Sequence, residues 1–172
     1  PYVVKPINEG SSLGVYIVQK DEEWPVATET WNDDEPVLVE DYVPGRELTV
    51  AIMEERSLEV LEIKPVQGFY DFDAKYTKGR VEYIIPAVIP NSTREEVLHF
   101  ALLAHQTLGC RGVTRADFRY DGSEDGLGLR LLEVNTQPGL TPTSLVPEIA
   151  AHVGIDFQRL VNWMLEDARC NA

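Results

Sequence analysis

The chain has 172 residues, of which 44% are hydrophobic and 26% are charged, a composition typical of an ordinary globular protein. Its length allows one good core or two small lobes. The formal net charge of −14 argues against a nucleic-acid-binding surface, because there is no basic stripe to neutralise backbone phosphates. A bound nucleotide is compatible with this charge, since a divalent metal held by carboxylates offsets phosphate charge locally.

Cysteine content and hydropathy indicate the cellular compartment and whether the protein associates with a membrane. Cys110 and Cys170 are too few and too far apart for a disulfide framework or a zinc ligand set, so we expect reduced thiols in a cytoplasmic protein. No apolar run reaches membrane-spanning length and no signal peptide is recognisable, so we expect no membrane partner. The chain starts at Pro1 inside a strand-like run, without an initiator Met, and we expect a piece of a longer protein.

Short apolar or alternating runs dominate the first 63 residues and predict antiparallel strands. Two runs flank a Gly/Ser loop and two flank a charged turn, so we expect two hairpins. The four strands are Tyr2–Lys5, Val15–Val18, Leu48–Met53 and Ser57–Ile63. Between the hairpins, Asp21–Glu35 is predicted to be irregular or helical and Val37–Glu40 to be a buried strand. Pro65–Arg80 shows no period and carries four aromatic residues, which is typical of a functional loop.

The second half of the chain contains the predicted helices. Ser92–Glu95 has the pattern of a capping box, and Gly109 is expected to end the helix that follows. The apolar face of that helix is predicted to comprise Val97, Phe100, Ala101, Ala104 and Leu108. A third hairpin, Gly112–Tyr120 with Leu129–Asn135, precedes two more helices, Ser144–His152 and Asp156–Ala168. Strands joined by hairpins, followed by helices in the second half of the sequence, indicate an α+β fold built on antiparallel sheet.

The third hairpin contains the most informative polar side chains. Leu132 and Val134 alternate with Glu133 and Asn135, while Arg115 and Asp117 share one face of the facing strand. A turn centred near residues 124–125 would set Asp117 opposite Glu133, with Cβ atoms about 5 Å apart. That spacing suits a shared Mg²⁺, whose oxygen ligands lie about 2.1 Å away. Arg115 could bind phosphate or an oxyanion, or simply pair with the acids on the surface.

Three upstream features are weaker. Lys5 ends a strand before the Gly10–Gly14 loop, whose N–H groups could cradle phosphate, although the loop could equally be a plain hairpin tip. Glu40 and Glu47 flank a Pro-Gly break and could serve a nucleotide or face solvent. Lys75 lies in the long aromatic loop and could reach a terminal phosphate when that loop closes, or be solvated.

Four motifs occur in a fixed order: VVKPINEGSSLGV, VEDYVPGRELTV, YDFDAKY, and TRADF followed by LLEVNTQPGLTPTSLVP. Together they resemble the C-terminal part of the D-alanine–D-alanine ligases of the ATP-grasp superfamily, over nearly all of Pro1–Gly154. The resemblance implies an α+β ATP-grasp fold, an antiparallel sheet core with flanking helices, truncated at its N-terminus. Residues 1–45 would be the remainder of the small lobe, and residues 46–172 the C-terminal domain with the metal and acceptor sites. Ala116 and Leu140 are mild departures from the family pattern.

The resemblance also implies the cofactors, which would be ATP and two Mg²⁺, with Mn²⁺ as a substitute. The metals would be held by Asp117, Glu133 and Asn135. Lys5 would contact the α/β-phosphates and Lys75 the γ-phosphate. The remaining nucleotide contacts would come from Glu40, Val43, Phe69 and Leu132 around the adenine and from Glu47 at the ribose.

Further roles implied by the resemblance concern D-alanine. Arg115 and the backbone N–H of Gly139 would stabilise the tetrahedral oxyanion. Ser144 and the backbone of Leu145 would bind the carboxylate of the second D-alanine. Ser11 and Tyr76 would belong to the hydrogen-bonded set that closes the long loop over the first D-alanine, and Tyr76 favours an amine as second substrate.

The implied reaction is activation of one D-alanine by ATP to an acyl phosphate, followed by attack of a second D-alanine, for peptidoglycan synthesis in the cytoplasm. Family members carry an N-terminal domain for the first D-alanine that is missing from these residues, so we expect the chain by itself to be inactive. A homodimer is compatible with the full-length parent. Two alternatives stay open: a ligase of the D-alanine–D-lactate type, and a nucleotide-binding module without catalysis.

Overall fold

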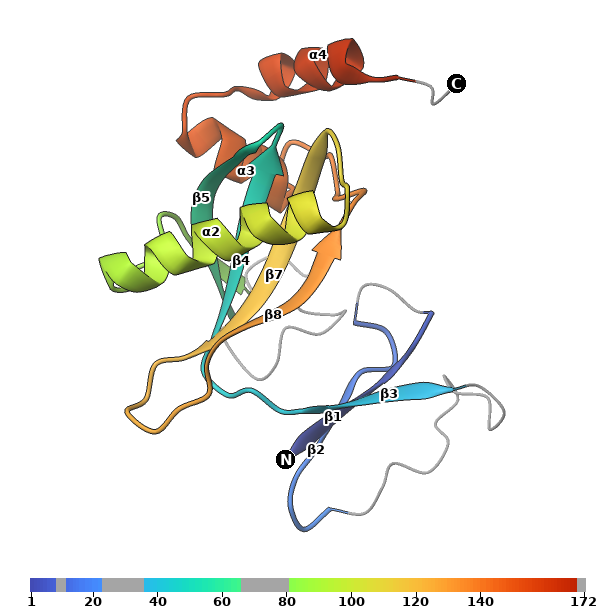
Figure 1. Cartoon of the computed structure of the whole chain (residues 1–172), viewed down its shortest axis with the longest axis vertical. Helices are drawn as coiled ribbons and strands as arrows, with labels where there is room; N and C mark the ends of the chain where they lie inside the picture. The colour runs from blue at the N-terminus through green and yellow to red at the C-terminus, as the bar shows by residue number, and fades with distance from the viewer. Residues whose placement is uncertain (9–11, 23–35, 66–80, 170–172) are drawn as a thin grey trace. The chain divides into compact units, whose positions relative to one another are not determined.

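The computed structural model describes residues 1–8, 12–22, 36–65 and 81–169, and Figure 1 shows their secondary structure. The chain divides into two compact units. The first contains Pro1–Pro44 together with the described ends of Lys64–Glu82, and the second contains Gly45–Ile63 and Tyr83–Ala172. Each unit has a sheet of its own.

The first unit is built on a three-stranded sheet. It comprises β1 (Tyr2–Pro6), β2 (Tyr16–Val18) and β3 (Val37–Asp41), in the order β2-β1-β3 with antiparallel pairing throughout. The predicted first hairpin is therefore confirmed. The expectation that 37–40 is a buried strand is wrong in one respect: the strand forms, but Leu38 and Val39 are 43% and 51% exposed. Among the described strands, β3 lies at an edge of its sheet and has a neighbour on one side only.

The second unit is built on a five-stranded sheet in the order β6-β5-β4-β7-β8. Antiparallel registers join β4 to β5, β4 to β7 and β7 to β8, which confirms both remaining hairpins. The strands are β4 (Arg46–Met53), β5 (Arg56–Pro65), β6 (Val81–Ile84), β7 (Val113–Asp121) and β8 (Gly128–Asn135). The central position of β4 explains its five consecutive buried residues.

Helix α2 (Asn91–Thr107) covers one face of this sheet and contacts β4, β7 and β8 (Figure 1). Its buried stripe differs from the predicted one: Val97 and Ala101 are buried, whereas Phe100 and Leu108 are exposed. The stripe is a strict i, i+4 row, Thr93, Val97, Ala101 and His105. The core beneath it contains Leu48, Val50, Ile52, Val60, Ala116 and Phe118.

The predicted capping box of α2 is also wrong. The helix starts two residues earlier, with Pro90 rather than Ser92 at the N-cap and no side-chain cap hydrogen bond. Because proline fixes φ near the helical value, it sets the start of the helix without a hydroxyl cap. The C-terminal end agrees with the sequence, since Gly109 follows the C-cap residue with φ of +64°.

Two shorter helices complete the second unit. Helix α3 (Leu145–His152) contacts β4 and lies behind the sheet in Figure 1, while α4 (Phe157–Asp167) contacts α3. The predicted N-cap of α4 is confirmed, because the Asp156 side chain accepts a hydrogen bond from the Arg159 N–H at 2.8 Å. In the part of the chain that the structure describes, no helix combines the length and apolarity needed to cross a membrane.

Candidate active site

The face of the five-stranded sheet opposite α2 carries the candidate site. The register of β7 and β8 sets Asp117 directly opposite Glu133 and Arg115 opposite Asn135, as the sequence predicts. Pairs in this relation have Cβ atoms about 5 Å apart. On the other side of β7, Thr49 of β4 is paired with Asp117. Three adjacent strands therefore contribute polar side chains to one place.

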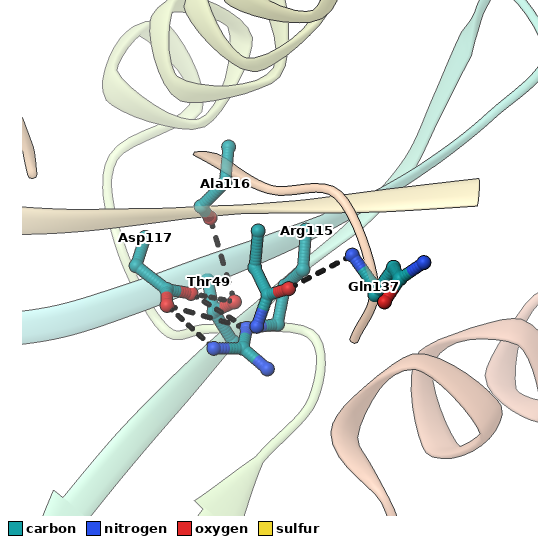
Figure 2. A network of polar contacts seen from close by, with 6 residues as sticks. Thr49, Arg115, Ala116, Asp117 and Gln137 are labelled. Atoms are coloured by element: carbon teal, nitrogen blue, oxygen red, sulfur yellow. Dashed lines mark hydrogen bonds and ion pairs between the residues drawn. The ribbon is translucent and has the colours of Figure 1, made fainter. Parts of the chain in front are cut away.

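Asp117 is the most highly bonded residue of this group (Figure 2). Arg115 donates from Nε to Oδ1 at 2.9 Å and from Nη2 to Oδ2 at 2.7 Å. The Thr49 hydroxyl donates to Oδ1 at 2.6 Å. The side chains of Arg115 and Asp117 are only 16% and 13% exposed, so this ion pair is partly shielded from solvent. Arg115 thus pairs with the acid, which was one of the two arrangements that the sequence left open.

The alternation expected along β8 is broken at one position. Asp117 pairs with Glu133 but Phe118 pairs with Leu131, so Leu132 is the extra residue of a β-bulge. Val134 packs against the core beneath α2, whereas Leu132 is exposed. Leu132 therefore does not share the buried environment of Val134, and the bulge interrupts the regular alternation along β8. Exposure of Leu132 leaves its side chain accessible to a ligand.

The loop after β8 connects the acid pair to α3. The Asn135 side-chain oxygen accepts a hydrogen bond from the Gln137 N–H at 3.0 Å, which fixes the start of this loop. At its other end, Ser144 is the N-cap residue of α3, and its Oγ accepts from the Thr141 N–H at 3.0 Å. A Cβ added at Gly139 would lie 3.1 Å from this Oγ. Glycine at this position therefore keeps the space beside Ser144 open.

The other predicted site residues are distributed over both units. In the first unit, Lys5 Nζ and Glu40 Oε2 form an ion pair at 2.6 Å, and Val43 is half-buried. In the second unit, Glu47 Oε2 lies 3.7 Å from Arg119 Nη1. Leu145 is buried as the first residue of α3. Four predicted residues, Ser11, Phe69, Lys75 and Tyr76, lie outside the described residues.

The donor set fits a hard divalent cation. Asp117, Glu133 and Asn135 offer two carboxylates and one amide oxygen from two adjacent strands, which is the ligand chemistry that Mg²⁺ and Mn²⁺ prefer. This set differs from a site made of three or more His, Cys, Asp or Glu side chains, and the described residues contain no site of that kind. The present set contains only two acids, and its third donor is an amide. Remaining ligands would have to come from water or substrate phosphate, as is usual for Mg²⁺.

Thr49 is the residue that sequence reasoning missed. It is fully buried in the middle of an apolar strand, and its hydroxyl contacts the Ala116 carbonyl at 3.4 Å and the Asp117 carboxylate. A buried hydroxyl requires a partner, so a threonine within a buried run was a usable signal. Its partner was not predictable, because β4 and β7 are more than 60 residues apart in the chain.

A sequence profile described as "D-ala D-ala ligase C-terminus" matches residues 1–166. The chain belongs to this family. The D-alanine–D-alanine ligase of Paramagnetospirillum magneticum is 54% identical over 173 residues, and that of Methylorubrum populi is 56% identical over 176 residues. Both alignments cover 99% of this chain but only 56% and 57% of the relatives, so the chain spans a little over half their length.

Solved structures of ligases agree with this family membership. The D-alanine–D-alanine ligase from Bacillus anthracis in complex with ATP is 31% identical, with a TM-score of 0.71, covering 97% of this chain and 53% of that chain. The VanG D-Ala:D-Ser ligase from Enterococcus faecalis is 29% identical, with a TM-score of 0.79, covering 96% and 49%. The predicted α+β ATP-grasp fold is therefore confirmed.

Proposed function

We propose that this chain is the metal- and acceptor-binding part of an ATP-dependent ligase that joins two D-alanines through an acyl phosphate. The observation that carries the proposal is the register of β7 and β8, which pairs Asp117 with Glu133 and Arg115 with Asn135. Phosphoryl transfer requires positioning and charge neutralisation rather than a nucleophilic side chain. Clustered acids and an arginine on one sheet face are suited to that task.

The acceptor half of the reaction is assigned to the loop after β8 and the start of α3. The Ser144 hydroxyl and the Leu145 N–H bind the carboxylate of the second D-alanine, and the positive end of the helix dipole favours that charge. The Gly139 N–H and the Arg115 guanidinium stabilise the oxyanion formed when the amine attacks. Such donors contribute most when they are fixed before the reaction, and the bonds that Ser144 makes to Thr141 supply this rigidity.

The nucleotide half of the proposal follows the roles that the family resemblance implies, residue by residue. Lys5 and Lys75 bind the phosphates, Glu47 binds the ribose, and Glu40, Val43, Phe69 and Leu132 surround the adenine. Asp117, Glu133 and Asn135 would hold two Mg²⁺, which when bound offset the phosphate charge. Ser11 and Tyr76 close the loop over the first D-alanine. The ion pairs Lys5–Glu40 and Glu47–Arg119 would both have to open or share their charges when ATP binds.

A hybrid enzyme tests this function. Residues 1–172 replace the corresponding part of the Paramagnetospirillum magneticum ligase, and ADP release and D-alanyl-D-alanine are measured with D-alanine and ATP. We expect the hybrid to form the dipeptide and its Asp117→Asn variant to lose about 100-fold or more in kcat. The isolated chain is expected to release no ADP. A folded hybrid that makes no dipeptide would overturn the proposed function, and turnover by the isolated chain would refute its inactivity.

Two alternatives, a ligase for another acceptor and a non-catalytic nucleotide-binding module, are tested by product analysis and by nucleotide binding. The fold match to a D-Ala:D-Ser ligase makes D-serine an alternative to D-alanine as the second substrate. D-lactate is the other alternative. Competition between D-alanine, D-serine and D-lactate in the hybrid, followed across pH, identifies the preferred acceptor, and Tyr76 favours the dipeptide. Calorimetry of the isolated chain with Mg-ATP tests the non-catalytic module: heat of binding with an inactive hybrid would favour that module.

A further inference from the structure

The Asp117 carboxylate is already engaged before any metal is considered. Each of its oxygens accepts a hydrogen bond from Arg115, and Oδ1 accepts a second one from Thr49. Arg115 Nε also makes a longer contact with Oδ2 at 3.3 Å. A carboxylate has about four lone-pair positions, and each of them therefore already faces a donor. A divalent cation at Asp117 would therefore meet a guanidinium that already neutralises the carboxylate.

We propose that Arg115 is a built-in counter-cation that a divalent metal must partly displace from Asp117, and that Thr49 is a positioning residue that keeps the carboxylate aimed during this exchange. The inference rests on the proposed metal role of Asp117. It adds a consequence for Arg115: metal binding frees N–H donors of its guanidinium, so loading of the metal makes Arg115 available to the oxyanion.

The two contacts of Asp117 should affect metal affinity in opposite directions. Arg115 and the metal are both positive and use the same oxygens, so removing the arginine removes a competitor. Thr49 is neutral, fully buried and bonded to one oxygen, so removing its hydroxyl releases a constraint on orientation. Outer contacts of this kind typically change metal affinity by about 10- to 100-fold.

Arg119 provides a matched control for Arg115. It lies four residues further along β7 on the same face, it is similarly shielded, and it pairs with Glu47 rather than with Asp117. Arg119→Gln and Arg115→Gln change the net charge by the same amount. Any general effect of charge on cation binding therefore appears in both variants, and only the local competition distinguishes them.

The experiment is a Mn²⁺ titration of the 172-residue chain, in which paramagnetic broadening of the backbone amide signals of residues 117 and 133 reports occupancy at this site. Arg115→Gln is expected to bind Mn²⁺ about 3- to 10-fold more tightly than the wild type, and Arg119→Gln to change affinity less than twofold. Thr49→Val is expected to bind about 10-fold more weakly, with Thr49→Ser restoring affinity. Asp117→Asn should abolish the broadening.

The outcomes separate this inference from the proposed function. If the wild type binds Mn²⁺ at residues 117 and 133 but Arg115→Gln binds equally or more weakly, the counter-cation role is overturned and the metal site stands. If no variant shows broadening there at millimolar Mn²⁺, the metal site fails and the inference fails with it. If the amide spectrum shows that Arg115→Gln does not fold, Arg115→Lys replaces it. The Mn²⁺ affinity of Arg115→Lys is expected to lie between that of the wild type and the tighter affinity expected for Arg115→Gln. An affinity equal to that of the wild type would overturn the counter-cation role.

Discussion

The two faces of the five-stranded sheet use the same kind of ion pair for different purposes. On the α2 face, Arg94 of the helix binds Glu59 of β5 through Nε and Nη2, at 2.8 and 2.6 Å. On the opposite face, Arg115 binds Asp117 with similar geometry, but both residues belong to β7. The first pair joins two elements, whereas the second joins side chains that the strand already holds side by side.

This difference shows which pair stabilises the fold. Glu59 is only 9% exposed, and burial raises its pKa, but hydrogen bonds from Arg94 and from the Val60 N–H outweigh this and leave the pKa below its ordinary value. The ionised pair is thus part of the packing of α2 on the sheet. An ion pair within one strand adds no tertiary connection, which leaves Arg115 and Asp117 available for exchange with a ligand.

Breaking the α2-face pair should have the largest effect on stability. Arg94→Met leaves the Glu59 carboxylate buried without its partner, and we expect a loss of about 2 kcal/mol in the free energy of unfolding. The estimate is at the low end for buried pairs because the Arg94 side chain is 35% exposed. Urea denaturation followed by circular dichroism measures it. Arg130→Met, on the exposed edge strand, is the control and should cost less than about 0.5 kcal/mol.

The same pair predicts a pH dependence. Because the pKa of Glu59 is lowered in the folded state, its contribution is complete above the unfolded value of about 4.3 and is lost as pH falls through the folded pKa. The stability difference between wild type and Arg94→Met should therefore be large at pH 7 and shrink below pH of about 4. A difference that is constant from pH 7 to pH 3 would mean that packing, not charge, connects α2 to the sheet.

On the site face, the equivalent substitution should matter less. Arg115→Gln is expected to cost less than about 1 kcal/mol, because Thr49 continues to donate to Asp117 and the strand register is unaffected. Urea denaturation of Arg115→Gln beside Arg94→Met tests the comparison directly. Equal losses in the two variants would remove the distinction between a structural face and a ligand-binding face.

The sequence predicted what depends on local order. The hairpin of β7 and β8 closes over a short Gly- and Asp-rich turn, which placed Asp117 close to Glu133. The exact pairing also needs the β-bulge, because regular counting outward from Asp121 and Gly128 would set Asp117 opposite Leu132. Asp156 was recognised as an N-cap because its partner, Arg159, is three residues away. In both cases every group in the interaction lies within one short stretch of chain.

The sequence did not predict what depends on distant partners or on strand irregularity. The contact of Thr49 with Asp117 requires knowing that β4 lies beside β7. The bulge at Leu132 has no glycine to mark it, and the buried row of α2 was obscured because Thr93 and His105 are polar. His105 is accommodated there by a 2.7 Å contact with the Thr114 hydroxyl, and burial lowers its pKa.

The smallest expected effect is a gain in stability near the acceptor loop. Glu148 follows Ser144 by one helical turn on α3, which packs against β4 from the side opposite α2. Among the described residues its carboxylate has no cationic or hydrogen-bonding partner, and burial raises its pKa. A raised folded pKa favours the protonated form, so ionisation of Glu148 weakens the fold as pH rises.

Glu148→Gln should therefore stabilise the chain by about 0.5 kcal/mol at pH 7, discounted for partial hydration, and by nothing below pH of about 4. Thermal unfolding at both pH values measures this, with Glu166→Gln on α4 as the control. A loss at pH 7 would show that the carboxylate has a stabilising partner after all, and the site face would then contain a structural charge like that of Glu59.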